Sequence, residues 1–186
     1  MTLDEIIADA SHRMDQAVEK VSEDFQGIRT GRANPQILNK VMVDYYGSPA
    51  PLQQLANFSV PEPRILIVNP FDKGAINAVE KAIRDADLGL NPANDGAIIR
   101  CVFPELTEER RKDFIKLAKQ AAEEGRVAVR NIRRHARDAM QKLEDDGDVG
   151  QDEHDRYTKR LEELTGQHVA RIDKILEQKE QELLEV

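Results

Sequence analysis

The sequence predicts an α+β protein with two domains, in which a long three-helix bundle carries an inserted small β/α/β domain. All eight prolines fall between Pro35 and Pro104. The segments on either side lack proline and place apolar residues at the three- and four-residue steps of long amphipathic helices. Residues 1–30 and 106–186 are therefore expected to form a discontinuous bundle domain, and residues 31–105 the inserted α+β domain.

The longest predicted helix runs from Leu106 to Leu143. Thr107 is a candidate N-cap, and Glu108 and Glu109 place negative charge in the first turn, where the helix dipole favours it. Many residues of its apolar seam are small, which lets neighbouring helices approach closely. The seam repeats as a heptad and comprises Ile115, Ala118, Ala122, Gly125, Val129, Ile132, Ala136, Ala139 and Leu143.

A stripe of charged residues, which we name the basic ridge, follows the same helix beside the seam. The C-terminal half of the ridge consists of arginines, whose planar guanidinium groups suit phosphate, and Arg134 lies beside it. Charge alone leaves two interpretations, a solvated helix face and a surface for a polyanion. Few carboxylates lie three or four positions from these arginines, which favours a surface for a polyanion over a solvated face. The ridge comprises Lys112, Lys116, Lys119, Glu123, Arg126, Arg130, Arg133 and Arg137.

The net charge of -8 conceals a strong asymmetry along the chain. The segment from Leu106 to Leu143 holds 11 basic and 6 acidic residues, whereas the remainder holds 16 basic and 29 acidic residues. An acidic remainder would repel nucleic acid from every surface except the basic ridge. The acidic composition therefore does not exclude a nucleic-acid partner.

Two further long helices are predicted. The first has apolar positions from Leu3 to Ile28, and the chain leaves it between Gly27 and Gly31, because Gly31 permits a left-handed backbone and the proline after Asn34 disfavours helix. The last runs from about Gln151 to Leu184, after a turn around Gly147 and Gly150. Three such helices should pack together, because none can bury its stripe alone.

The predicted inserted domain alternates strands and turns. Strands are expected at residues 41–46, 64–68 and 97–103, and a short helix at residues 75–86 after Asp72. The segments Gly47 to Pro51 and Leu88 to Gly96 have the composition of turns.

Catalytic and metal-binding patterns are absent from the sequence. Cys101 lies in an apolar run with no activating partner nearby, which favours a buried structural thiol, and the four histidines match no metal or catalytic motif. The acidic stretch 144–153 lacks the spacing of a calcium loop. We therefore predict no catalytic residue, no metal site and no bound cofactor. The lack of a long apolar stretch predicts no membrane partner and a cytoplasmic location.

Four long stretches of this sequence resemble bacterial ribosome recycling factor. They are RTGRANPQIL from Arg29, VDYYGSPAPLQQLA from Val43, VEKAIRDADLGLNP from Val79 and LTEERRKDFIKLAKQAAEEGRVAVRNIRRHARD from Leu106. The resemblance implies an L-shaped protein of tRNA-like dimensions whose two domains are joined by flexible connections. It also implies an activity: with elongation factor G and GTP, the protein splits the post-termination ribosome into subunits. We expect it to act as a monomer.

The same resemblance assigns roles to particular residues. Contacts to large-subunit ribosomal RNA (rRNA) fall on Arg29, Arg130 and Arg133, with the neighbouring candidates Arg126, Arg134 and Arg137. The hinge falls on Thr30, Gly31 and Arg32 and on Pro104, Glu105 and Leu106. His135 stands where the family pattern leads us to expect an acid. Two alternative functions are a helical adaptor whose ridge binds an acidic protein and a hydrolase with an unrecognised site.

Overall fold

Three long helices and a small antiparallel sheet account for most of the chain in the computed structural model, which describes residues 1–185. The predicted α+β fold class is confirmed. Contacts between residues divide the chain into two units. The first comprises Met1–Phe25 and Lys116–Glu180, and the second comprises residues 26–115 with the C-terminal residues from Gln181.

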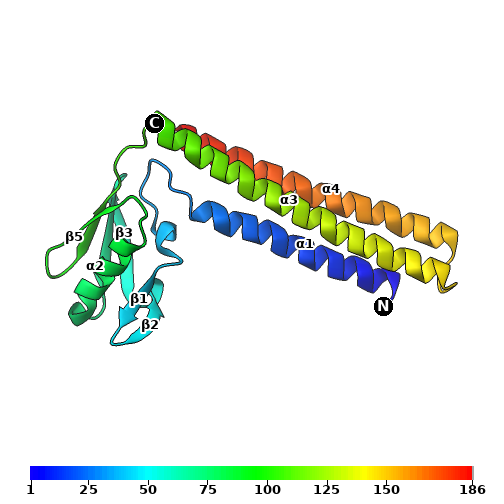
Figure 1. The fold of residues 1–186 in the computed structure, drawn as a ribbon, viewed down its shortest axis with the longest axis horizontal. Helices are drawn as coiled ribbons and strands as arrows, with labels where there is room; N and C mark the ends of the chain where they lie inside the picture. Colours follow the sequence, from blue (N-terminus) through cyan, green and yellow to red (C-terminus); the bar gives the residue numbers. More distant parts are fainter. Residues whose placement is uncertain (186) are drawn as a thin grey trace. The chain divides into compact units, whose positions relative to one another are not determined.

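The first unit is built from helices α1 (Leu3–Gln26), α3 (Glu108–Asp145) and α4 (Gln151–Leu184), which lie side by side (Figure 1). The first residues of α3, up to Ile115, and the last residues of α4, from Gln181, belong to the second unit. Thr107 caps α3 as predicted, since its Oγ1 accepts a hydrogen bond from the backbone N–H of Arg110 at 3.1 Å. The predicted long helices are therefore present, with boundaries close to those expected.

The buried seam of α3 departs from the predicted heptad near its end. Ala139 is exposed, and Met140 is buried in its place. The reason is that Ile132, Ala136 and Met140 follow two successive steps of four, which suit a straight helix of 3.6 residues per turn better than a strict heptad. The buried residues of α3 are Ala118, Ala122, Gly125, Val129, Ile132, Ala136 and Met140.

Two carboxylates of α1 join that helix to α4. Asp4 Oδ1 accepts hydrogen bonds from Tyr157 Oη at 2.8 Å and from Arg160 Nη1 at 3.4 Å. Asp15 Oδ1 lies 2.7 Å from Nε2 of the buried His168 and 2.8 Å from Arg171 Nη1. These contacts, chiefly the one with His168, hold the pKa of Asp15 below its usual value of 3.8.

The Asp15 contacts predict a pH-dependent contribution to stability. A carboxylate whose pKa is lowered by folding stabilises the protein above its unfolded pKa and loses that effect as the pH falls through the folded pKa. Asp15→Asn should lower Tm at pH 6 by about 1–3 °C, the size expected for an exposed pair. The difference from the parent protein should shrink in thermal melts below about pH 3.8. A difference that is equally large at pH 2.5 would contradict this account.

The second unit contains a two-stranded hairpin and a four-stranded antiparallel sheet (Figure 1). The hairpin consists of β1 (Met42–Tyr45) and β2 (Ser48–Pro51). The sheet has the order β3-β4-β6-β5 and comprises β3 (Ala56–Glu62), β4 (Ile65–Pro70), β6 (Ile99–Val102) and β5 (Asn91–Asn94). Helix α2 (Ile76–Asp85) contacts β1 and β5. Short 3-10 helices occupy Pro35–Leu38, Leu52–Gln54 and Lys73–Ala75.

The sequence interpretation missed strands at three proline-containing segments. Ser48–Pro51 was predicted as a turn but forms β2, and only Tyr46 and Gly47 make the turn. β5 lies within the segment Leu88–Gly96, which has the composition of turns, and β3 lies in a segment for which no strand was predicted. Pro49 and Pro51 fit β2 because it is an edge strand, where a missing N–H can face away from the partner strand.

Cys101 lies in the core of the second unit, on β6 opposite Leu66 and Pro92. It is buried as predicted, and burial raises the pKa of its thiol to about 11. The thiol is therefore protonated at neutral pH and has a structural role. None of the helices within residues 1–185 combines the length and the apolar character required to span a bilayer.

Candidate nucleic-acid interface

The basic ridge lies along α3, and its arginines differ in their surroundings. Arg130, Arg134 and Arg137 are exposed, whereas Arg133 is half-buried. Arg126 retains only 19% of its side-chain exposure. The difference follows from position, because residues closer to the buried seam are covered by the neighbouring helices.

Arg126 links two helices of the first unit. Its Nε and Nη2 lie 2.8 and 2.7 Å from Asp173 Oδ1 of α4, and its Nη1 lies 3.0 Å from Glu123 Oε2. Burial alone would lower the pKa of Arg126, but the hydrogen bonds to the two carboxylates outweigh it and raise the pKa. This guanidinium is thus engaged within the protein, and it holds α3 and α4 together.

Two other ridge arginines also have acidic partners. Arg130 Nη1 lies 3.5 Å from Glu123 Oε1, and Arg137 Nη2 lies 3.2 Å from Asp138 Oδ1. The expected shortage of nearby carboxylates is therefore wrong for Arg126, Arg130 and Arg137. Both pairs are solvent-exposed, and exposed pairs contribute about 0–1 kcal/mol, so a phosphate could displace the carboxylates at little cost.

Arg133 and Arg134 differ from the other arginines of this helix face in their lack of partners among the described residues. Within residues 1–185, neither side chain has a hydrogen bond or an ion pair. Their full sets of N–H donors therefore remain available for planar, two-point contacts with an anion. They lie on adjacent positions of α3, between Arg130 and Arg137.

Arg29 occupies a different setting, in the second unit rather than the first. Its side chain is 9% exposed and lies over the ring of Phe103, 5.8 Å from the ring centre. Its Nε and Nη2 are buried without a hydrogen-bond partner in the part of the chain that the structure describes. Burial, and secondarily the charge of Arg110, lowers the pKa of Arg29. A buried guanidinium with unsatisfied donors is costly, so Arg29 would gain from an anionic acceptor.

The predicted hinge residues lie close to the turn between β3 and β4. The N–H of Ala33, next to the first hinge segment, donates to Pro63 O at 2.7 Å, and Glu105 pairs with Arg64 at 3.3 Å. Thr30, Gly31, Arg32, Glu105 and Leu106 line one hollow of about 670 Å³.

Gly31 does not adopt the left-handed backbone that glycine permits, because its φ is not positive. An added Cβ would meet only Glu185 O, at 3.9 Å, so no close packing requires glycine here.

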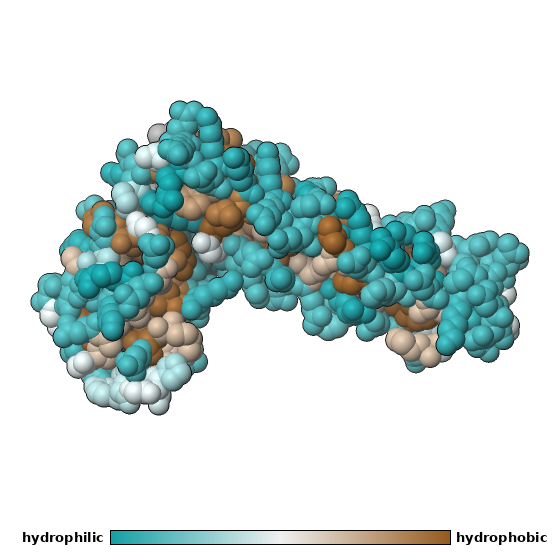
Figure 2. Space-filling model, viewed as in Figure 1, coloured by the Kyte–Doolittle hydropathy of each residue, from teal (hydrophilic) through white to brown (hydrophobic). Residues whose placement is uncertain are grey.

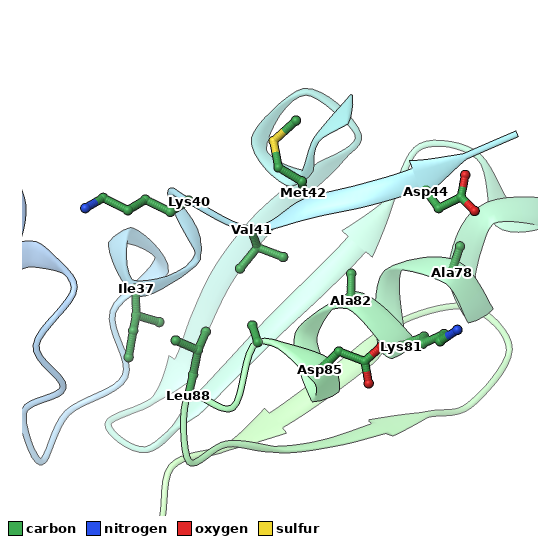
Figure 3. Close-up of a pocket in the computed structure, with 11 residues that line it drawn as sticks. Ile37, Lys40, Val41, Met42, Asp44, Ala78, Lys81, Ala82, Asp85 and Leu88 are labelled. Atoms are coloured by element: carbon green, nitrogen blue, oxygen red, sulfur yellow. The ribbon is translucent and has the colours of Figure 1, made fainter. Parts of the chain in front are cut away.

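A second hollow of about 600 Å³ lies in the second unit between β1 and α2 (Figure 3). Val41, Ala78 and Ala82 contribute apolar lining. The charged residues of the lining are Lys40, which precedes β1, Asp44 on β1, and Lys81 and Asp85 on α2. Within residues 1–185, no group of three or more histidine, cysteine, aspartate or glutamate side chains is arranged to hold a metal ion.

The fold and the ridge together define an α+β protein with a long helical region, a small antiparallel sheet and a cationic helix face. The chain belongs to the ribosome recycling factor family, a family of translation factors, whose sequence profile matches residues 5–184. It is 56% identical to the ribosome-recycling factor of Nocardioides sp. and 55% identical to that of Cutibacterium acnes. Each alignment spans 184 residues, 99% of this chain and 100% of the relative.

Solved structures give the same assignment. The chain is similar to a solution structure of ribosome recycling factor, with a TM-score of 0.81 and 40% identity over 99% of this chain and 98% of that one. It is also similar, with a TM-score of 0.70 and 45% identity over both full chains, to a chain of a ribosomal assembly. That assembly places Thermus thermophilus ribosome recycling factor and Escherichia coli elongation factor G on the E. coli post-termination complex.

Proposed function

We propose that this chain binds the post-termination ribosome and, with elongation factor G and GTP, promotes its splitting into subunits and its release from mRNA. Family membership carries this proposal, and the ribosome-bound relative supports it. The cytoplasm is the corresponding location. The protein acts as a monomer and as a binding factor rather than an enzyme, because the elongation factor supplies GTP hydrolysis and no bound cofactor is needed.

The basic ridge is the proposed contact with large-subunit rRNA. Arg133 and Arg134 carry this part of the proposal, because their guanidinium groups have no competing partner within residues 1–185. Arg130 and Arg137 can exchange exposed carboxylates for phosphates. Arg126 acts mainly by holding α3 against α4, and the buried Nε and Nη2 of Arg29 would reach an acceptor on the RNA once its side chain moves from over Phe103.

The proposed mechanism is mechanical. Residues 1–30 and 106–186 form the RNA-bound domain, and elongation factor G moves residues 31–105 about the connections at Thr30–Arg32 and Pro104–Leu106. A subunit-splitting assay on post-termination ribosomes tests this function, with this protein, elongation factor G or GTP omitted in turn. Unchanged splitting without this protein would refute it. Co-sedimentation with ribosomes at low and high salt separates it from an adaptor that binds an acidic protein.

The proposed hinge gives a separate prediction. Gly31→Val should fold normally, because the nearest atom to an added Cβ is 3.9 Å away and φ is not positive. The β-branched side chain restricts backbone motion, so splitting should slow while ribosome binding is largely retained. Gly150→Val, the same change at an open glycine before α4, is the matched control. Equal losses of binding and splitting in Gly31→Val would indicate a contact surface instead.

A further inference from the structure

The turn of the β1–β2 hairpin holds an aromatic residue in a conformation that tyrosine rarely adopts. Tyr46 has φ 52° and Gly47 has φ 87°. Two-residue hairpin turns with both φ values positive favour asparagine or glycine at the first position, because a bulky side chain is strained there. Tyr46 is also 73% exposed. Neither burial nor turn preference explains the tyrosine, and strain of this kind often accompanies a functional role.

Asp72 fixes the Tyr46 ring in place. The hydroxyls of Tyr46 and Tyr45 both donate to Asp72 Oδ2, at 2.8 and 3.1 Å, and the two rings pack edge to face with centres 4.7 Å apart. Gly74 leaves room for this arrangement, since a Cβ there would lie 3.0 Å from the Tyr46 hydroxyl. A ring that is already immobilised loses little conformational entropy when a partner binds.

The surroundings of this ring are apolar and negatively charged. Phe71, next to Asp72 in the sequence, is a 63% exposed apolar residue. Brown, apolar areas reach the surface of the second unit in Figure 2. Asp44 Oδ1 accepts the N–H of Gly47 at 3.0 Å. Within residues 1–185, neither Asp44 nor Asp72 has an ion pair with a basic side chain. We name Asp44–Gly47 with Phe71 and Asp72 the hairpin tip.

Lys73, which follows Asp72 in the sequence, contacts other residues. Lys73 Nζ contacts Asn69 Oδ1 and lies 2.6 Å from Ala97 O. Hydrogen bonds, first from the Tyr46 hydroxyl, lower the pKa of Asp72, so that carboxylate stays ionised at neutral pH. Uncompensated carboxylates repel phosphate and attract guanidinium, and an exposed tyrosine face also favours guanidinium.

We propose that the hairpin tip docks an arginine-bearing segment of a partner protein, with a guanidinium stacked on Tyr46 and paired with Asp44. Asp44 also lines the hollow between β1 and α2 (Figure 3), where Val41, Ala78 and Ala82 give the aliphatic part of the same segment an apolar surface beside the charged Lys81 and Asp85. The proposal rests on the proposed function in taking the ribosomal complex as the place where this partner is met. The partner is a protein rather than RNA, because the tip offers carboxylates instead of basic groups.

The first test uses the full-length protein and a defined probe. The peptide acetyl-Gly-Arg-Gly-Arg-Gly-amide should perturb the NMR signals of the Tyr46 ring and the Gly47 amide more than its lysine counterpart does. Read at the Gly47 amide, Tyr46→Asn removes an exposed cation–π contact and Asp44→Asn an exposed ion pair, so each should weaken the response by about two- to fivefold. Tyr46→Asn loses the hydrogen bond to Asp72 but relieves the strain of a positive φ, so its Tm should change little, which separates docking from a structural role. Equal responses to both peptides, or unaffected variants, would overturn the proposal.

The second test locates the partner. Tyr46 is replaced by the photo-cross-linker p-benzoylphenylalanine, and the protein is irradiated on post-termination ribosomes with and without elongation factor G. The control carries the same group at Tyr157, which Asp4 and Arg160 engage. A cross-link to an arginine-containing protein peptide, specific to position 46, is expected. Cross-links to RNA alone, or none above the control, would overturn the proposal. Ridge variants that lose ribosome binding while the peptide response persists would separate the two hypotheses.

Discussion

Gly125→Leu should unfold at a markedly lower temperature than the parent protein. Gly125 is buried in α3, where an added Cβ would lie 3.3 Å from Ile172 Cδ1 of α4 and well inside van der Waals contact with Val21 Cγ2 of α1. Val21 is β-branched and cannot swing away without leaving its rotamer, so the helices themselves must separate. Overpacking of this kind costs about 1–3 kcal/mol or more, equivalent to about 3–10 °C in Tm.

The same change at Gly166 is the matched control. Gly166 lies within α4 with no atom within 4 Å of an added Cβ, so Gly166→Leu should raise Tm slightly through the higher helix propensity of leucine. Gly125→Ala should also destabilise, since its Cβ alone makes the close contact with Val21. Thermal unfolding of all three variants checks this prediction. A Gly125→Leu protein as stable as the parent would show that the three helices do not meet at this glycine.

The helical seam was predictable because it depends on local spacing. Gly125 and Ala122 were assigned from the three- and four-residue steps, and both are buried. The burial of Met140 instead of Ala139 was not predictable in the same way. Which of two adjacent apolar residues faces the partners depends on how far the helix drifts from an ideal heptad, and that drift is set by the neighbouring helices.

The partners of the charged residues in the ridge were harder to predict from the sequence. Glu123 was visible within the ridge, but Asp173 reaches Arg126 from another helix, 47 positions along the chain. Periodicity places residues on a face and does not reveal what the facing helix contributes. The strands that contain prolines were also hard to predict from the sequence. Pro49 and Pro51 are tolerated because β2 is an edge strand, and this is a property of the sheet rather than of the segment.

Arg133→Ala should weaken ribosome binding by about ten- to a hundredfold without changing Tm. The magnitude follows from losing a charge-assisted hydrogen bond worth about 1.5–3 kcal/mol. Stability should be unaffected, because Arg133 has no hydrogen bond or ion pair within residues 1–185. Arg126→Ala provides the contrast, since it removes the link to Asp173 and should lower Tm as well as binding.

Salt dependence decides between a phosphate contact and a merely solvated arginine. Each lost phosphate contact should reduce the slope of log affinity against log salt by about 0.7–0.9. Arg156→Ala is the matched control, because Arg156 is exposed on α4 and has no hydrogen bond or ion pair in the described part of the chain. Arg160 is less suitable, since it contacts Asp4 and Tyr157. Ribosome affinities at several salt concentrations provide the measurement. Equal affinity and slope for Arg133→Ala and Arg156→Ala would remove Arg133 from the RNA contact, and the ridge would then be a solvated helix face at that position.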